Sequence, residues 1–242
     1  MHGQVTLEAK EGIAVLTLDR AAKHNAITNV MAGELAAHAQ RINGDEAIRA
    51  VLLRGAGDRA FCAGMDLNAI KAFPTAWDFR HRPDYPGAVR AIRKPVIAAM
   101  KGWSLGGGFE LALAADIRIA GRSTRIGFPE VTHGWVGGGG ASQVLPRVAG
   151  LGVAMRLLLT GDQIDAEEAL RLRLVEQVVE DAELEETAMA LCRRRAALSP
   201  VAVQAVKAAV RQSLEAPLSA GLAYENEMNV LCLAALREGA SQ

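Results

Sequence analysis

The chain has 242 residues, half of them hydrophobic, which is enough to bury one sizeable α/β core. Its 27 basic and 27 acidic residues balance, so no overall charge favours nucleic acid or an anionic membrane as a partner. Cys62, Cys192 and Cys232 are too few and too widely spaced for a disulfide framework or a CxxC metal site.

Metal, targeting and membrane signals are also missing from the sequence. The five histidines do not pair at the spacing of zinc sites. The N-terminus lacks the basic-then-apolar pattern of a signal peptide, and no apolar run approaches the roughly 20 residues of a membrane helix. We therefore expect a cytoplasmic protein that binds no metal and does not enter a membrane.

The first half of the chain predicts alternating strands and helices. Residues 5–20 predict a hairpin that turns at a Glu-Gly pair. Thr28 stands where it would cap a helix that runs to about Arg41. Further strands are expected at 50–57, 96–102 and 117–120, and a helix at 107–115. This order of strand, glycine turn, helix and strand predicts an α/β fold with partly parallel sheets.

The second half of the chain becomes mostly helical. Residues 144–161 predict two helices, and a short amphipathic helix and a last strand at 175–179 follow. The final helix, at about 217–237, carries a wide apolar stripe that suits packing on the body or on another subunit. The proline-bearing stretch 72–90 is expected to be an irregular surface segment.

Three consecutive glycines, Gly106 to Gly108, lie between a predicted strand and an apolar helix in WSLGGGFELALAAD (103–116). A helix N-terminus offers unpaired amides and partial positive charge, which suit an oxygen that becomes negative. The glycines leave room there for a ligand carbonyl. A second glycine turn, in AFCAGMDL (60–67), offers the amide of Met65. Two amides that converge on one carbonyl oxygen would form an oxyanion hole.

Two glutamates lie near these glycine turns. Glu110 falls in the first turn of its helix, where it can simply compensate the helix dipole. Glu130, in IGFPEVTHGW, can equally be a solvated acid after a proline turn. Together, the two carboxyls would hold one water molecule and share acid and base roles. The spacing alone leaves these interpretations open.

The ordered motifs FCAGMDL, KPVIAAMKGWSLGGGFELALAADIRIA and RIGFPEV resemble the enoyl-CoA hydratase/isomerase, or crotonase, family. The resemblance runs from the N-terminal hairpin and KHNAI to REG near the end of the sequence. It implies an α/β spiral of ββα units with an acyl-CoA site in residues 1–190, and a C-terminal helical trimerisation region in residues 191–242. It also implies a homotrimer or a dimer of trimers.

The resemblance places the oxyanion hole on the backbone N–H groups of Met65 and Gly107, and the two catalytic glutamates of hydratases at Glu110 and Glu130. It implies reversible addition of water to a trans-2-enoyl-CoA to give a 3-hydroxyacyl-CoA. Glu110 would deprotonate the water while Glu130 delivers a proton to C2. Coenzyme A would be part of the thioester substrate, and no separate cofactor is expected. A family isomerase, an acyl-CoA hydrolase or a catalytically silent acyl-CoA-binding subunit is the alternative.

The remaining site residues are also implied by the resemblance. The candidates for binding CoA are Lys23, Ala60, Ala63 and Asp66. Of these, Lys23 can equally be a solvated turn lysine. The candidates for the acyl pocket are Trp77, His133 and Trp135, although packing or solvent exposure is the commoner fate of residues like the last two.

Four features depart from the family pattern. Asn68 stands where hydratases often have a lysine, and Gly137 stands where a proline is common. Three prolines interrupt the segment 72–90, which the family implies to be largely helical. The sequence stops at REGASQ, before an aromatic and basic tail that usually follows REG, so we expect CoA affinity to be affected.

A dinucleotide-binding enzyme is a further alternative, because GAGDRA (55–60) matches GxGxxA after a predicted strand. That motif requires a helix immediately afterwards, and the sequence predicts another turn there instead. We therefore do not expect nicotinamide dinucleotide binding.

Overall fold

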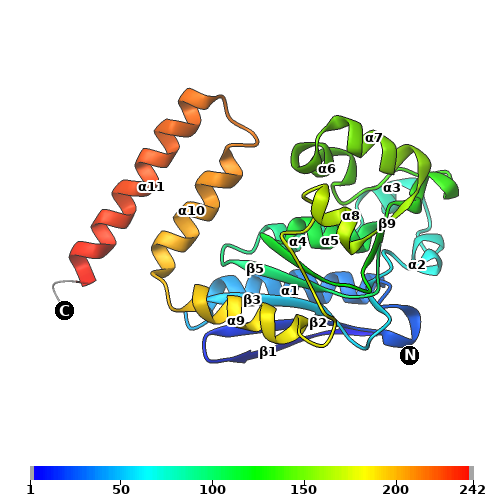
Figure 1. The fold of residues 1–242 in the computed structure, drawn as a ribbon, viewed down its shortest axis with the longest axis horizontal. Coiled ribbons are helices and arrows are strands. Elements are labelled where there is room, and N and C mark those ends of the chain that lie inside the picture. The colour runs from blue at the N-terminus through cyan, green and yellow to red at the C-terminus, as the bar shows by residue number, and fades with distance from the viewer. Residues whose placement is uncertain (1–2, 240–242) are drawn as a thin grey trace.

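The computed structural model describes residues 3–239, whose body contains two β-sheets (Figure 1). The larger sheet has six strands in the order β1-β2-β3-β5-β7-β10. All neighbours in it are parallel except β1 and β2, which form the predicted hairpin. Its strands are β1 (Gln4–Lys10), β2 (Ile13–Asp19), β3 (Ala50–Gly55), β5 (Val96–Met100), β7 (Ile117–Gly121) and β10 (Gln177–Val179).

The smaller sheet has four short strands in the order β4-β6-β8-β9. It is parallel except for the last pair, β8 and β9. Its strands are β4 (Ala60–Cys62), β6 (Trp103–Leu105), β8 (Arg125–Gly127) and β9 (Gln163–Asp165). The sequence did not predict these strands, because three residues are too few to establish an alternating pattern.

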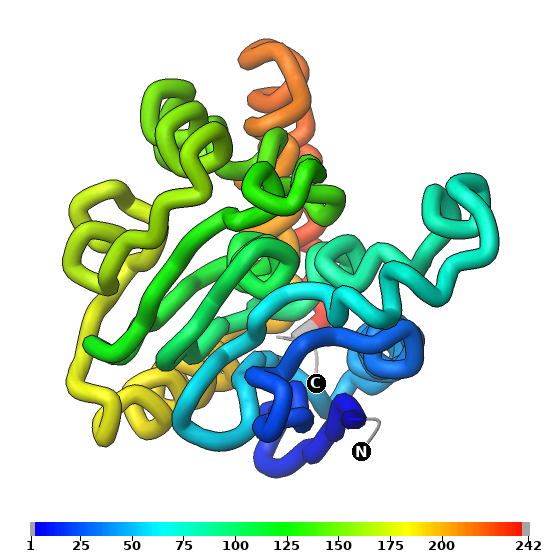
Figure 2. The backbone as a smooth tube through the Cα atoms, turned by 90° about the vertical axis from the view of Figure 1, so that its right-hand side faces the viewer, coloured from blue at the N-terminus to red at the C-terminus, as the bar shows by residue number. Residues whose placement is uncertain are grey.

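From β3 to β8, successive strands alternate between the two sheets, and this alternation generates a spiral that Figure 2 follows along the chain. The pairs β3 and β4, β5 and β6, and β7 and β8 each place one strand in the larger sheet and the next in the smaller. Helices return the chain to the larger sheet after the first two pairs, so the repeating unit is ββα. The predicted spiral of ββα units is therefore confirmed.

The helices of the body follow the strands in chain order. The first, α1, begins after Thr28, whose hydroxyl accepts a hydrogen bond from the Met31 amide, as the sequence predicts. The helices of the body are α1 (Asn29–Gly44), α2 (Leu67–Lys71), α3 (Ala76–Arg80), α4 (Tyr85–Arg90), α5 (Gly107–Ala114), α6 (Ala141–Ala149), α7 (Leu151–Thr160), α8 (Ala166–Arg171) and α9 (Leu184–Ala196). Two 3₁₀ helices, Ala21–Lys23 and Pro129–His133, complete them.

The core lies on both faces of the larger sheet. One face packs with α1 and the helices beside the smaller sheet, around large buried side chains such as Phe61, Phe109 and Phe128. The other face, which includes Leu52 and Ile97, packs against α9. Strands buried on both faces have continuous apolar sequences rather than alternating ones, which explains the apolar runs of β3 and β5.

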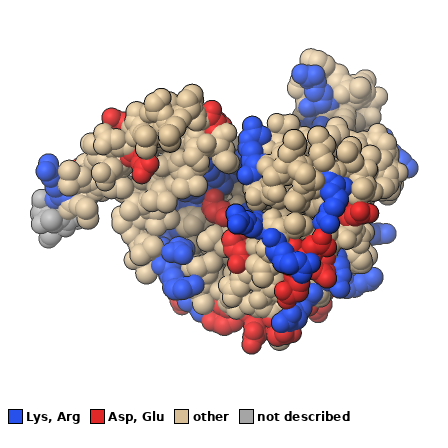
Figure 3. Space-filling model, turned by 45° about the horizontal axis from the view of Figure 1, so that its top comes forward, with Lys and Arg blue, Asp and Glu red and all other residues tan. Residues whose placement is uncertain are grey.

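The last two helices, α10 (Pro200–Gln212) and α11 (Leu218–Gly239), pack on each other and project from the body (Figure 1). We call this pair the C-terminal hairpin. The helix before it, α9, still covers the larger sheet, so the predicted domain boundary at 190/191 falls inside that helix. In Figure 3, acidic and basic side chains intermingle over the body, whereas the hairpin at the left is mostly uncharged.

The stretch 72–90 differs from the irregular segment that the sequence predicted. It contains α3 and α4, and the segment around α2 and α3 projects at the right of Figure 2. Thr75 caps α3 and Asp84 caps α4, while Pro86 occupies the first turn of α4, where a missing N–H has no consequence. Prolines therefore divide this segment into short helices.

The residues after GAGDRA form β4, so this stretch lacks the strand–turn–helix unit that dinucleotide binding requires. Within residues 3–239, no helix is long and apolar enough to cross a membrane.

Candidate active site

A cavity of about 490 Å³ opens between the start of α5, the α4 segment and the glycine-rich loop before α6. Seven of the eleven site residues expected from the sequence line it: Ala63, Met65, Gly107, Glu110, Glu130, His133 and Trp135. Four others do not line it: Lys23, Ala60, Asp66 and Trp77. The fold therefore gathers both glutamates and both glycine turns at one place.

Each of the three consecutive glycines allows a different close approach within the protein. A Cβ at Gly106 would lie 2.5 Å from Glu130 Oε1, and one at Gly107 would overlap the Tyr85 hydroxyl. A Cβ at Gly108 would overlap the carbonyl oxygen of Cys62. The sequence predicted room for a ligand carbonyl here, whereas in the structure protein groups occupy all three side-chain directions.

Met65 and Gly107, whose amides are the expected oxyanion hole, both line the cavity. The loop before Met65 packs on the start of α5, since a Cβ at Gly64 would lie 3.2 Å from the Gly107 nitrogen. On either side of Met65, the Ile27 amide donates to Gly64 O and the Asp66 amide donates to Ile27 O. Among the described residues, neither the Met65 amide nor the Gly107 amide donates to a protein acceptor. Both are therefore available to a ligand in the cavity.

Glu110 is buried at the first turn of α5, with 3% of its surface exposed. Its Oε1 accepts hydrogen bonds from the backbone amides of Gly139, at 2.9 Å, and Ala141, at 2.8 Å. These bonds leave Oε2 without a protein donor among residues 3–239, and Glu110 lines the cavity. A carboxylate held in this way has a fixed orientation and one oxygen able to accept a proton.

Glu130 lies in the 3₁₀ helix Pro129–His133, on the other side of the glycine turn. Its Oε2 is buried and has no hydrogen-bond partner among the described residues. Burial raises the pKa of Glu130 to about 6, and the negative charge of Glu110 adds to the rise. The two carboxyls thus differ in their surroundings, and Glu130 is the one biased toward the protonated form.

Tyr85, the first residue of α4, adds a phenol group to the site. Its ring is buried, and its hydroxyl packs against Gly107. Burial raises the pKa of Tyr85 well above its ordinary value, and negative charge on Glu110 and Glu130 acts in the same direction. The phenol therefore stays a neutral hydrogen-bond donor at the cavity wall.

The four CoA-binding candidates differ in how their polar groups are used. Lys23 is exposed in the 3₁₀ helix Ala21–Lys23. The Ala60 carbonyl accepts a hydrogen bond from Asn25, and the Ala63 amide donates to His24 O. The Asp66 carboxylate pairs with Arg20 at 2.5 Å and caps α2. Hydrogen bonds and an ion pair within the protein thus already engage many of the polar groups of this segment.

Two of the three acyl-pocket candidates line the cavity and the third does not. His133 and Trp135 line the cavity, and the Trp135 ring lies 6.5 Å from that of Phe79. Trp77 lies outside the cavity, with 68% of its surface exposed, and its ring packs on His81 at 4.3 Å between centroids. No group of three or more His, Cys, Asp and Glu side chains among residues 3–239 is placed to hold a metal ion.

The spiral fold and this cavity define a protein of the crotonase class. Residues 8–240 match the sequence model of the enoyl-CoA hydratase/isomerase family, and the chain belongs to this family.

Several relatives are similar over most of their length. The chain is 36% identical to a short-chain-enoyl-CoA hydratase of Clostridium acetobutylicum, over 92% of this chain and 87% of the relative. It is also 36% identical to a 2,3-dehydroadipyl-CoA hydratase of Escherichia coli, over 96% of this chain and 91% of the relative. The crystal structure of an enoyl-CoA hydratase subunit I from Geobacillus kaustophilus matches with a TM-score of 0.92 and 31% identity, covering 98% of this chain and 93% of that one.

Proposed function

We propose that this protein is an enoyl-CoA hydratase, which adds water reversibly to a trans-2-enoyl-CoA to give a 3-hydroxyacyl-CoA. One observation carries the proposal: two carboxyls in different environments and two free backbone amides line the same cavity. Relatives that are named short-chain-enoyl-CoA hydratase and crotonyl-CoA hydratase, at 36% and 35% identity, support it.

The thioester oxygen would lie between the amides of Met65 and Gly107. When water attacks C3, negative charge moves toward this oxygen, and two prearranged donors stabilise it more than the neutral carbonyl. Loss of one such donor typically raises the barrier by about 3–4 kcal/mol. The partial positive charge at the start of α5 acts in the same direction.

Glu110 would take a proton from the attacking water while Glu130 gives its proton to C2. The water oxygen bonds to C3 and the C2–C3 double bond becomes single, so one water is consumed and the two carboxyls exchange a single proton between them. In the reverse direction Glu130 removes the C2 proton and Glu110 returns a proton to the departing hydroxyl. These steps use no metal or redox cofactor.

Replacement of each glutamate by glutamine tests the proposal. The Glu110→Gln amide oxygen can still accept from Gly139 and Ala141, so the fold is retained while the base is lost. We expect crotonyl-CoA hydration, followed by the loss of enoyl-thioester absorbance, to fall at least about 100-fold in Glu110→Gln and in Glu130→Gln. Full activity in either variant would refute the role of that residue. Crotonyl-CoA binding without turnover by the wild type would instead favour a silent binding subunit.

We further propose that the C-terminal hairpin mediates self-association into a homotrimer or a dimer of trimers. None of the described side chains of α11 is buried, although the helix is 22 residues long. Large apolar side chains remain more than half exposed on the hairpin: Val206, Val210, Leu218, Leu222, Val230, Leu231 and Leu236. Monomers rarely leave so much apolar surface in water. Sedimentation of the wild type beside Leu222→Asp tests this, since an unchanged assembly in the variant would contradict it.

The CoA moiety, we propose, lies along the segment around Ala60, Ala63 and Asp66, with Lys23 near its phosphates. The cytoplasmic location stays a prediction from the sequence.

A further inference from the structure

Arg82 places a cation in the wall of the cavity, between α3 and α4. Its side chain is half-buried. Its Nη1 donates to the carbonyl of Phe79 at 2.9 Å, and its guanidinium carbon lies 4.2 Å from the centre of the Phe79 ring. These two contacts hold the guanidinium in one orientation and leave several of its five donors unused.

This guanidinium has no carboxylate partner among residues 3–239. The acids that share the cavity are engaged elsewhere or biased toward neutrality. Glu110 accepts from two backbone amides, and Asp84 accepts from the Gly87 amide as the cap of α4. Glu130 is held toward its protonated form by burial. A half-buried cation that no protein carboxylate neutralises is suited to an anionic group of a ligand.

The glycine-rich loop before α6 passes close to the Arg82 side chain. A Cβ at Gly138 would overlap Nη2 of Arg82, so only glycine leaves the guanidinium its place. The residues on either side of Gly138 contact Glu110: a Cβ at Gly137 would lie 2.8 Å from Oε1, and the Gly139 amide donates to the same oxygen. Arg82 and Glu110 therefore adjoin neighbouring residues of the same loop. If Glu110 acts at C3, Arg82 is placed to meet the acyl group.

Two aromatic rings line the cavity near Arg82. Phe79 and Trp135 line the same wall, 6.5 Å apart between ring centres. Methylene groups would pack there, while a charged end would reach the guanidinium. The other arginine of the cavity, Arg80, is exposed and makes no such buried contacts.

We infer that Arg82 binds a carboxylate at the far end of the acyl group, and that the preferred substrates are 2-enoyl-CoA thioesters of dicarboxylic acids. This inference rests on the proposed hydratase function for the reaction, but the anion site itself can be tested by binding alone. The Glu110 carboxylate would repel a dicarboxylic acyl group, and Arg82 is the residue placed to offset that repulsion.

Saturated thioesters separate binding from turnover, because they have no double bond to hydrate. Calorimetric titration would compare glutaryl-CoA with pentanoyl-CoA, and adipyl-CoA with hexanoyl-CoA; each pair differs only in a terminal carboxylate. We expect the wild type to bind at least one dicarboxylic ester more tightly than its uncharged partner. Arg82→Gln should reduce this ratio of affinities about tenfold or more, and Arg82→Lys should retain part of it. Arg171→Gln, an exposed arginine on α8 outside the cavity, should leave the ratio unchanged.

Two results would overturn the inference. The first is a wild type that binds neither dicarboxylic ester more tightly than its partner. The second is an Arg82→Gln variant that weakens both members of each pair equally, which would assign Arg82 to CoA instead. If the dicarboxylic preference and its loss are observed but no enoyl-CoA is hydrated, the anion site stands and the proposed hydratase function fails.

Discussion

The backbone amide of Gly139 donates a 2.9 Å hydrogen bond to Oε1 of Glu110, so the proposed catalytic base is also a structural anchor of the loop before α6. The Ala141 amide makes a second bond to the same oxygen. The residue that precedes α6, Gly140, has no side chain to cap the helix, and Glu110 supplies that acceptor from another part of the chain. The position of α6 and the orientation of Glu110 therefore depend on each other.

Adding one methyl group at Gly139 should impair catalysis more than stability. A Cβ there would lie 2.6 Å from Glu110 Oε2 and 2.5 Å from Pro86 Cγ, both nearer than real Cβ contacts. The Glu110 side chain must then rotate away from its place in the cavity. We expect Gly139→Ala to lower kcat for crotonyl-CoA hydration about 10- to 100-fold, since misplacement by 1 Å has this effect on positioned groups.

Gly152→Ala provides the control, because a Cβ at Gly152 in α7 meets nothing within 4 Å. Its activity should equal that of the wild type. Circular dichroism would establish that both variants are folded. A Gly139→Ala enzyme with wild-type kcat would show that the Glu110 orientation seen here is unimportant for turnover.

The pH profile of kcat/KM should report the carboxyl pair. The proposed steps require one proton on the pair, and burial raises the pKa of Glu130 to about 6. Above that pH the free enzyme loses the shared proton, so kcat/KM should fall by about tenfold per pH unit at the alkaline end. Hydration consumes no net proton, so the same decline must appear for hydration of the enoyl ester and for dehydration of the hydroxy ester.

Measurement of both directions between pH 5 and 8 tests this expectation. The residual activity of Glu130→Gln should lack the decline, because a glutamine side chain does not titrate in this range. A flat wild-type profile, or declines at different pH in the two directions, would be incompatible with a shared proton on this pair.

Burial of Glu130 should also lower the free energy of unfolding when this carboxyl is ionised. A carboxyl whose pKa is raised in the folded protein favours folding only while it is protonated, so its ionisation destabilises the protein as pH rises from about 4.5 to 6. The rise corresponds to at most about 2 kcal/mol, and partial exposure reduces this to about 1 kcal/mol. Glu130→Gln should therefore unfold about 2–4 °C higher than the wild type at pH 8.

The difference in Tm should disappear at pH 4, where both side chains are neutral. Thermal unfolding followed by circular dichroism at the two pH values provides the measurement. Equal Tm values at pH 8 would mean that solvent fully compensates the Glu130 charge in the folded protein.

The sequence predicted the larger sheet and α5 well because their signals are local. Apolar runs, glycine turns and the Thr28 cap each act over a few residues, and the structure places the hairpin, α1 and α5 where these signals indicated. The resemblance to a family supplied the spiral connection, which no local pattern contains. Glu110 and Glu130 meet only because β6 and β8 are neighbours in the smaller sheet.

Local sequence patterns could not predict where the remaining site residues lie. Tyr85 and Arg82 belong to a proline-divided segment whose path past the glycine turn depends on tertiary packing. Gly107 is an example. The sequence shows that this position has no Cβ, but it does not show that the Tyr85 hydroxyl occupies the space where a Cβ would lie.

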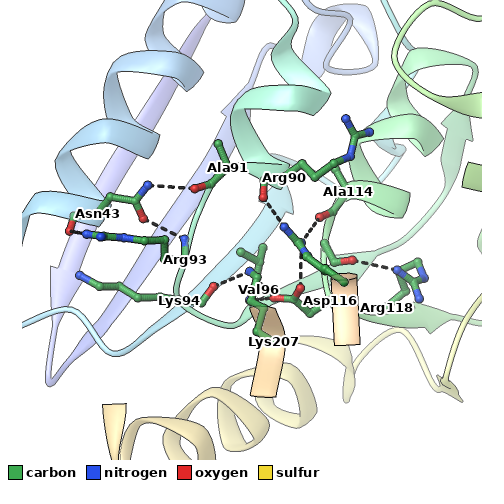
Figure 4. A network of polar contacts seen from close by, with 12 residues as sticks. Asn43, Arg90, Ala91, Arg93, Lys94, Val96, Ala114, Asp116, Arg118 and Lys207 are labelled. Atoms are coloured by element: carbon green, nitrogen blue, oxygen red, sulfur yellow. Dashed lines mark hydrogen bonds and ion pairs between the residues drawn. The ribbon is translucent and has the colours of Figure 1, made fainter. Parts of the chain in front are cut away.

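Asp116, just before β7, connects the C-terminal hairpin to the body (Figure 4). Its Oδ2 accepts from Lys207 Nζ at 2.6 Å and from the Val96 amide at 2.8 Å, while Oδ1 accepts from Arg211 at 2.9 Å. Lys207 also donates to the carbonyl of Lys94 at 2.7 Å. Burial lowers the pKa of Lys207 to about 8, so this ammonium group depends on its carboxylate partner.

Removal of the Asp116 carboxylate should loosen the hairpin. Asp116→Ala leaves Lys207, whose side chain is 9% exposed, without its counter-ion, and we expect the free energy of unfolding to fall by about 3 kcal/mol. Glu186→Ala is the matched control, because its ion pair with Arg193 is exposed and should contribute less than about 1 kcal/mol. Urea unfolding at pH 7 would measure both changes. If the two variants lost the same small amount, the hairpin would be attached mainly by apolar packing; if only Asp116→Ala lost stability, this charge network fixes the hairpin on the body.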